Sequence, residues 1–233
     1  MIRDFAQKPS IEFISAVNGL PEECLPYPSK RKPPKWIRYN ENFSNSPPTI
    51  RKCPGILDYA GIGYIVPLWA DLKIDYDSSL MMLNPEFSVP WANALLHPKE
   101  QFQGTPLESL SYPYSSVIKM EAPWRIKLTS GYSSVLVNPI YHEVHSSITV
   151  IPGCIDHDVF HTANIFVSFN FYGKGTVLIP RGTPLYQVLP FKRSVFSFSI
   201  RTQTAEDSIN SAREGNTLGT FNKRYWRYFW QKK

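Results

Sequence analysis

Apolar residues in this chain come in short runs separated by Gly, Pro and Asn, a spacing typical of strands joined by turns. Between residues 116 and 200 these runs include VIKME, WRIKLTS, SSVLVNP, SSITVIPG, NIFVSFNFYG, TVLIPRG and SVFSFSIRT. Upstream, the run from Tyr64 to Ala70 and the alternating Leu72, Ile74 and Tyr76 also predict strands. Many short strands at such spacing favour a sandwich or a distorted barrel, so we predict a mainly-β fold.

The two ends of the chain break this pattern. Residues 1–56 carry eight prolines between Pro21 and Pro54, which interrupt any long helix or strand, so we predict an extended Pro-rich arm with short strands at most. Residues 57–200 form the predicted β-rich domain, and residues 201–233 form a predicted helical tail that ends in basic and aromatic residues.

Two segments favour helices. The stretch TAEDSINSAREGN predicts a helix, with Thr204 as its N-cap and Gly215 as its C-cap. The stretch WANALL, residues 91–96, is ambiguous and fits one short helix. Gly131 and Gly182 stand at strand entries where a left-handed backbone is easy for glycine.

Composition narrows the class of protein. Apolar residues make up 42% of the chain, which is enough to build a core and argues against wholesale disorder. Cys24, Cys53 and Cys154 are odd in number and widely spaced, so we expect neither a disulfide framework nor a cysteine zinc site. No apolar run reaches the roughly 18–20 residues that a membrane span needs, and the start lacks the apolar core of a secretory signal. We therefore expect a soluble intracellular protein.

The net charge of +6 is concentrated in two clusters rather than along one face. One cluster surrounds a Pro-Pro pair, and the other lies at the C-terminus; their members are Lys30, Arg31, Lys32, Lys35 and Arg38, and Lys223, Arg224, Arg227, Lys232 and Lys233. Basic clusters can attract nucleic acid or an anionic surface. For the first cluster we favour a solvated loop.

Four short motifs follow one another in the centre of the chain. They are Ser130-Gly131-Tyr132, Gly153-Cys154-Ile155-Asp156, Ser168-Phe169-Asn170-Phe171-Tyr172-Gly173 and Gly182-Thr183-Pro184-Leu185-Tyr186-Gln187. In this order and at this spacing, they make residues 110–195 resemble the core of the dUTPase-like (β-clip) superfamily. The whole chain is also similar to a phage-encoded family with Gly-x-x-Asp-x-Asp hairpins and GTPxxQVxPFKR strands.

The dUTPase resemblance implies roles for particular residues. It places Asp156 where the family orients the attacking water, and it places Phe160 near the sugar, with Asn170 and Gln187 as further nucleotide-binding candidates. It also implies Mg²⁺ on the phosphates if the chain is a hydrolase, and no cofactor otherwise. The family's Arg-Ser-Gly phosphate clamp reads Pro139-Ile140-Tyr141 in this sequence, which supplies no cation.

Because charge stabilisation supplies most of the rate in phosphate chemistry, we favour a non-enzymatic role. We predict a structural or accessory phage protein, located in the host cytoplasm or the virion. It would act by binding other copies of itself, as a trimer by analogy, or other virion or host proteins. The alternative is a divergent dUTPase-like nucleotide pyrophosphohydrolase, in which Asp156 still orients the attacking water.

A second alternative rests on four histidines. His142, His145, His157 and His161 lie between two predicted strands with Glu143, Asp156 and Asp158, and such side chains suit Zn²⁺ or Fe²⁺ in a cupin-like enzyme. Histidines three or four residues apart share a face on a helix but not on a strand. Solvated or interface histidines are therefore the simpler interpretation.

The C-terminal KRYWRYFWQKK suits an amphipathic helix. Tyr225, Trp226, Phe229 and Trp230 would lie along one side and bind the protein's own body or a neighbouring subunit. Lys223, Arg224 and Arg227 make nucleic acid a possible partner of the same segment.

Overall fold

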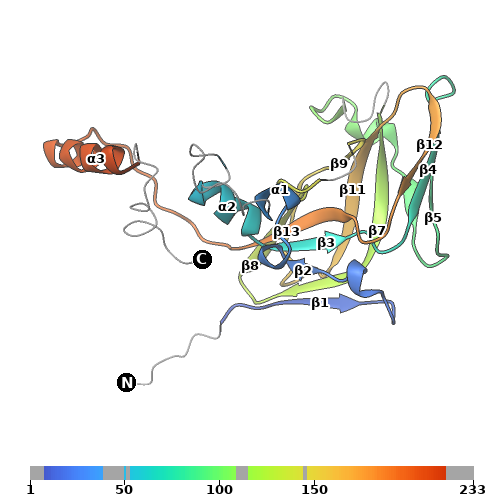
Figure 1. Cartoon of the computed structure of the whole chain (residues 1–233), viewed down its shortest axis with the longest axis horizontal. Helices are drawn as coiled ribbons and strands as arrows, with labels where there is room; N and C mark the ends of the chain where they lie inside the picture. The colour runs from blue at the N-terminus through green and yellow to red at the C-terminus, as the bar shows by residue number, and fades with distance from the viewer. Residues whose placement is uncertain (1–7, 39–49, 51–52, 109–114, 144–145, 219–233) are drawn as a thin grey trace.

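Three antiparallel sheets make up the body of the protein. The computed structural model describes residues 8–38, 50, 53–108, 115–143 and 146–218. We call the sheets the β7 sheet, the β13 sheet and the β4 sheet (Figure 1). The β7 sheet contains β1 (Ile11–Ser15), β6 (Ala94–Leu96), β7 (Ser115–Leu128), β9 (Ile148–Val150) and β11 (Thr162–Asn170). The β13 sheet contains β2 (Tyr27–Pro28), β3 (Tyr64–Pro67), β8 (Tyr132–Val137), β10 (Gly153–Ile155) and β13 (Pro184–Lys192). The β4 sheet contains β4 (Leu72–Asp77), β5 (Met82–Phe87) and β12 (Lys174–Ile179).

Helices are few and short. Among the described residues they are α1 (Lys35–Arg38), α2 (Pro54–Gly61) and α3 (Ala205–Leu218), with 3₁₀ turns η1 (Glu22–Cys24), η2 (Ser29–Arg31) and η4 (Lys99–Phe102). None of the described helices is long and apolar enough to cross a membrane. The mainly-β fold class predicted from the sequence is confirmed by these elements.

Strand order places segments that are distant in sequence side by side. β7 pairs with β11 along one edge, while its other edge is shared by β1 near Leu128 and by β6 near Met120. The β13 strand lies between β8 and β3, and β10 lies along the other edge of β8. The loop that follows β10 therefore contacts the end of β13. Where β9 ends, the side-chain amide of Asn138 bonds both the N–H and the C=O of Val150 and links the β13 sheet to the β7 sheet.

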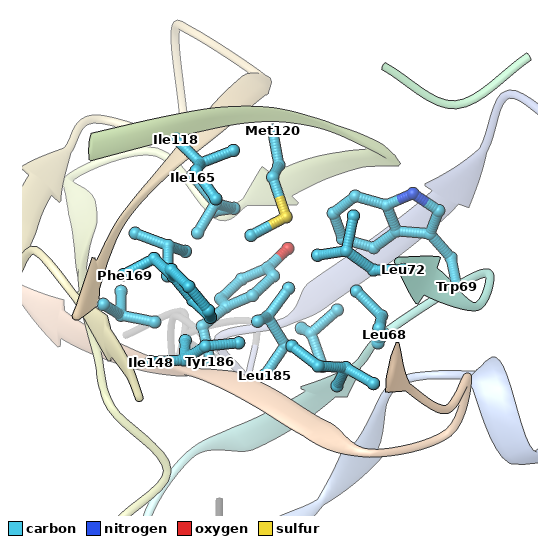
Figure 2. Packing of buried hydrophobic residues seen from close by; sticks show 14 of the residues in the cluster. Leu68, Trp69, Leu72, Ile118, Met120, Ile148, Ile165, Phe169, Leu185 and Tyr186 are labelled. Carbon is cyan, nitrogen blue, oxygen red and sulfur yellow. The ribbon is translucent and has the colours of Figure 1, made fainter. Parts of the chain in front are cut away.

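The core lies between the three sheets, as Figure 2 shows. Alternate residues of β7 and β11 point inward, because successive side chains of a strand face opposite sides. Fully buried members include Trp69, Leu72, Ile118, Met120, Ile165, Phe169 and Tyr186. The apolar runs that form paired strands therefore supply one continuous core.

Close packing at the end of α2 requires glycine at one position. Gly63 has a φ of +68°, and a Cβ there would lie 2.2 Å from the carbonyl oxygen of Val188. Gly131 and Gly182 have φ values of +85° and +80°, as predicted from their places at strand entries. Both strand entries thus use the conformation that glycine adopts without strain.

The N-terminal segment is more ordered than its prolines suggest. β1 pairs with β7 in full register from Ile11 to Ser15, and η1, β2, η2 and α1 follow before residue 39. The sequence analysis allowed short strands in this segment without placing one at IEFIS, and β1 and β2 are such short strands. The sequence-based division into an arm, a β domain and a tail stays a prediction.

Three local predictions differ from the structure. Residues 91–96 form no helix; β6 occupies Ala94–Leu96 and pairs with β7. Gly215 lies inside α3, which continues to Leu218, so it is not the C-cap. Residues 194–202, predicted as a strand, form none, because no strand of the described chain lies beside them.

The N-terminus of α3 follows the prediction. The backbone N–H of Asp207 donates to the Thr204 hydroxyl, and the backbone N–H of Thr204 donates to the Asp207 carboxylate in return. This reciprocal pair is a capping box with aspartate at its third position. Thr204 is therefore confirmed as the N-cap.

Candidate functional site

The loop between β10 and β11 holds the residues that the sequence singled out; we keep the predicted name hairpin for it, although the two strands belong to different sheets. The N–H groups of Val159 and Phe160 both donate to the carbonyl of Asp156, which closes the turn. The hairpin lies against the start of β8 and the end of β13, where Asp156 and Asp158 both contact Arg193 and His157 contacts Ser134. Their environments decide what each can do.

His157 is completely buried. Its Nδ1 lies 2.7 Å from the hydroxyl oxygen of Ser134, and its backbone carbonyl accepts from Leu128 and contacts Nδ1 of His161. Burial lowers the pKa of His157 to about 4, with the neighbouring His161 adding to the effect. The ring is therefore neutral near pH 7 and joins β8 to the hairpin.

Asp158 forms the strongest ion pair of the hairpin. Its side chain is only 4% exposed, and its oxygens accept from both terminal nitrogens of Arg193, at 2.9 and 2.5 Å, and from the N–H of Gly131 at 2.8 Å. Hydrogen bonds from Arg193, together with that from Gly131, lower the pKa of Asp158 to about 2. We call this pair, with Gly131, the Arg193 clasp.

Asp156 is in a different position. Its side chain is 63% exposed, and it accepts a hydrogen bond from the Ser133 hydroxyl at 2.5 Å. The cation beside it is Arg193, at 3.3 Å, the same guanidinium that Asp158 holds in two hydrogen bonds. Asp156 therefore lies on an open surface next to a cation that is already paired.

The other predicted nucleotide-binding residues lie in separate places. Phe160 is 61% exposed on the hairpin, while Asn170 is at the opposite end of β11, roughly 30 Å away at about 3.3 Å per strand residue. Gln187 is completely buried: its Oε1 accepts from the N–H of Ile140, and its Nε2 donates to Ser29 and to the carbonyl of Ile62. The structure does not bring these three residues together.

The Gln187 contacts give this residue a structural role. All three partners belong to the same chain, and they join β13 to η2 and to the loop after β8. Gln187 therefore stabilises the monomer.

The histidines do not converge on a point. His157 is buried, His161 contacts the His157 carbonyl, and His142 lies in the turn after Pro139. Across the described part of the chain, no three His, Cys, Asp or Glu side chains are arranged to hold a metal ion. His145 lies outside the described residues, as do Tyr225, Trp226, Phe229 and Trp230 and the basic Lys223, Arg224 and Arg227.

Sequence reasoning missed Arg193 and the two serines. Arg193 lies 35 residues beyond its partner Asp158, and nothing in the local pattern of the FKR segment indicates that pairing. Ser133 and Ser134 look like ordinary strand residues between apolar neighbours. What marks these two serines as site residues is that they are buried and bond the hairpin. The structure shows this, and the sequence does not.

Comparisons with known proteins do not assign this chain to a family. No protein-family model matches the chain, and no curated protein matches it. Among solved structures, it is similar to a mutant dUTPase from phage phi11 of S. aureus, with a TM-score of 0.34 and 9% sequence identity. That match covers 84% of this chain and 99% of the other. A TM-score this low supports no argument, so the fold class rests on the sheets themselves.

Proposed function

We propose that this protein is a non-enzymatic structural or accessory protein that acts by binding further copies of itself. The observation that supports this proposal is the segment of residues 194–204. From here on the name arm means this segment and not the predicted Pro-rich arm of residues 1–56. Figure 1 shows it running from the end of β13 to α3, away from the three sheets. Val195, Phe196, Phe198 and Ile200 are each at least 85% exposed along it.

The arm has the pattern of a strand without a partner. Phe196, Phe198 and Ile200 alternate with Ser197, Ser199 and Arg201, which is the two-residue period of a strand with one apolar face. Burying one such side chain is worth roughly 1.5–3 kcal/mol. Because monomeric proteins seldom leave a contiguous apolar strand in water, the arm is suited to adding to the sheet of another molecule.

A suitable receiving edge exists in the β4 sheet. β12 pairs only with β4, and it is as long as any edge strand among the described residues while containing no proline. β5, the other edge of that sheet, contains Pro85, which cannot donate a ladder hydrogen bond. Leu178 projects from β12 with 63% of its surface exposed. We therefore propose β12 of a second copy as the docking site for the arm.

The start of the arm is held in a fixed direction. Arg193 donates its backbone N–H to the carbonyl of Gly131, and its guanidinium is held by Asp158 and Ser133. The far end is capped, since Thr204 and Arg201 both bond Asp207 at the start of α3. A segment whose first residues are held to the body and whose last residues are ordered by a helix cap loses less conformational entropy on binding than a free tail.

The proposed biological setting is a phage, with the protein in the virion or the host cytoplasm. A phage origin, a trimeric state and a place in the virion rest on the sequence resemblances alone. The alternative, a nucleotide pyrophosphohydrolase, depends on Asp156, which lies in the open beside a paired arginine. The arm favours assembly over that alternative.

The molar mass in solution, measured by light scattering after gel filtration, tests the proposal. We expect the full chain to exceed 26.7 kDa and the triple variant F196S/F198S/I200S to return to that monomer mass. S197A/S199A changes the polar face of the same arm and should leave the oligomer intact, whereas L178K should weaken it from the receiving side.

A wild-type chain that stays monomeric at about 100 μM would contradict the proposal, because this concentration is well above the Kd of most stable assemblies. So would dUTP turnover by the purified protein that the Asp156→Asn variant lacks, since that result would favour the hydrolase.

A further inference from the structure

A cluster of three aromatic rings shares no residue with the Arg193 clasp. Trp36 of α1 and Tyr59 of α2 both pack edge-on against Tyr141, with ring centroids 5.8 Å away in each case and interplanar angles of 79° and 78°. The indole N–H of Trp36 donates to the carbonyl of Tyr141 at 3.0 Å. Trp36 and Tyr141 are 105 residues apart in the sequence, so the fold assembles this cluster from distant parts of the chain.

Tyr141 is held in a strained conformation. Its φ is +59°, in the left-handed region that bulky side chains rarely adopt. A tyrosine in this region costs of order 1 kcal/mol, and such strain concentrates at binding sites. Tyr141 is 42% exposed and its neighbour Tyr59 is 48% exposed. Packing in the core therefore does not explain why Tyr141 adopts a strained backbone conformation.

Cations border the aromatic cluster. Lys35 precedes Trp36 and reaches Glu143, two residues after Tyr141, at 3.5 Å. Lys30 lies along Gly61 at the end of α2; Arg31 ends the same 3₁₀ turn and Lys32 follows it, both with exposed side chains. The acidic groups on these elements are Glu143, paired with Lys35, and Asp58 of α2. The surrounding charge is therefore positive on balance.

These two features together select the ligand. Exposed aromatic rings bind either cations or flat π systems, and four neighbouring cations disfavour a cationic ligand. A ligand that is both planar and anionic satisfies rings and cations together. Single-stranded nucleic acid has this chemistry, since its bases stack on aromatic rings while its phosphates contact Lys and Arg.

We propose that the protein binds single-stranded nucleic acid across this surface, with Tyr59 and Tyr141 as base-stacking residues and Arg31 and Lys35 as phosphate contacts. The surface is distinct from the arm, so nucleic-acid binding and assembly are separable. It is also distinct from the C-terminal Lys223, Arg224 and Arg227, which the sequence indicated as nucleic-acid contacts.

Fluorescence anisotropy with a labelled 20-nucleotide oligo(dT) tests the proposal on the full chain. Tyr141→Gly is the sharpest variant, because glycine relieves the backbone strain while the ring is lost. We expect it to raise the Kd roughly tenfold, and Tyr59→Ala to do the same. Urea unfolding should find the stability of Tyr141→Gly within about 1–2 kcal/mol of the wild type, because relief of the backbone strain offsets part of the lost ring contacts, and this measurement separates lost binding from lost folding.

Salt dependence tests the phosphate contacts. R31S/K35S should reduce the slope of log Kd against log salt by roughly 1.4, at about 0.7 per contact on single strands. R125S/K127S removes the same charge from exposed positions of β7 and should leave the slope unchanged.

Three results would overturn the proposal. They are no binding at 50 mM salt, equal loss in both double variants, and binding that survives Tyr141→Gly but vanishes in K223S/R224S/R227S.

Discussion

Tyr186 lies at the centre of the core, and its hydroxyl points toward Met120 (Figure 2). The side chain is completely buried and, among the described residues, the hydroxyl has no hydrogen-bond partner. Burial therefore raises the pKa of this phenol well above its usual value. An unpaired buried hydroxyl costs about 1–3 kcal/mol, whereas the ring itself contributes apolar contacts.

We expect Tyr186→Phe to raise the free energy of unfolding by about 1 kcal/mol, because it removes the hydroxyl and keeps the ring. Tyr186→Leu should instead destabilise the protein, since it leaves a cavity between the sheets. Urea unfolding measures both. A Phe variant less stable than the wild type would mean that the hydroxyl makes a favourable interaction.

The Arg193 clasp predicts a pH dependence of stability. The folded-state pKa of Asp158, about 2, is below its ordinary value of 3.8, so the carboxylate stabilises the fold above pH 4 and this stabilisation is lost between pH 4 and 2. Asp158→Asn should therefore unfold more easily than the wild type at pH 6, while the two converge near pH 2. Thermal unfolding across this range measures the difference, and a constant difference at every pH would contradict the assigned cause.

Among the elements, strands were predictable where alternation coincided with a partner in the same chain. β7, β11 and β13 follow their apolar patterns, and Thr204 begins α3 where its side chain can cap. Alternation alone does not say whether a partner exists, and the arm has the strongest alternation of all. The clasp was unpredictable for a related reason: Arg193 and Asp158 meet only because β13 lies beside β8.

Local patterns also failed where tertiary pairing outweighed propensity. WANALL has good helix formers, but its last three residues extend the edge of β7. Asp156 matched the position of a catalytic residue in the family it resembles. Its exposure and the pairing of Arg193 with Asp158 depend on packing that no short motif encodes.

For the whole molecule, the body should fold without the arm and residues 205–233. A chain ending at Arg193 keeps the three sheets, the core and the clasp, and among the described residues it loses only segments that extend away from them (Figure 1). We expect this truncated chain to unfold cooperatively, with a Tm that does not depend on protein concentration. The full chain should behave differently, because unfolding of an oligomer includes dissociation, and its Tm should rise by a few degrees Celsius over a hundredfold concentration range.

The full-length F196S/F198S/I200S variant separates the arm from the rest of the deleted segment. It keeps α3 and the residues beyond it, so it should lose the concentration dependence of Tm as completely as the truncated chain does. If this variant instead keeps the wild-type dependence while the truncated chain loses it, the assembly contact lies in residues 205–233. Scanning calorimetry of the three proteins at matched concentrations therefore decides which part of the C-terminal region binds the second copy.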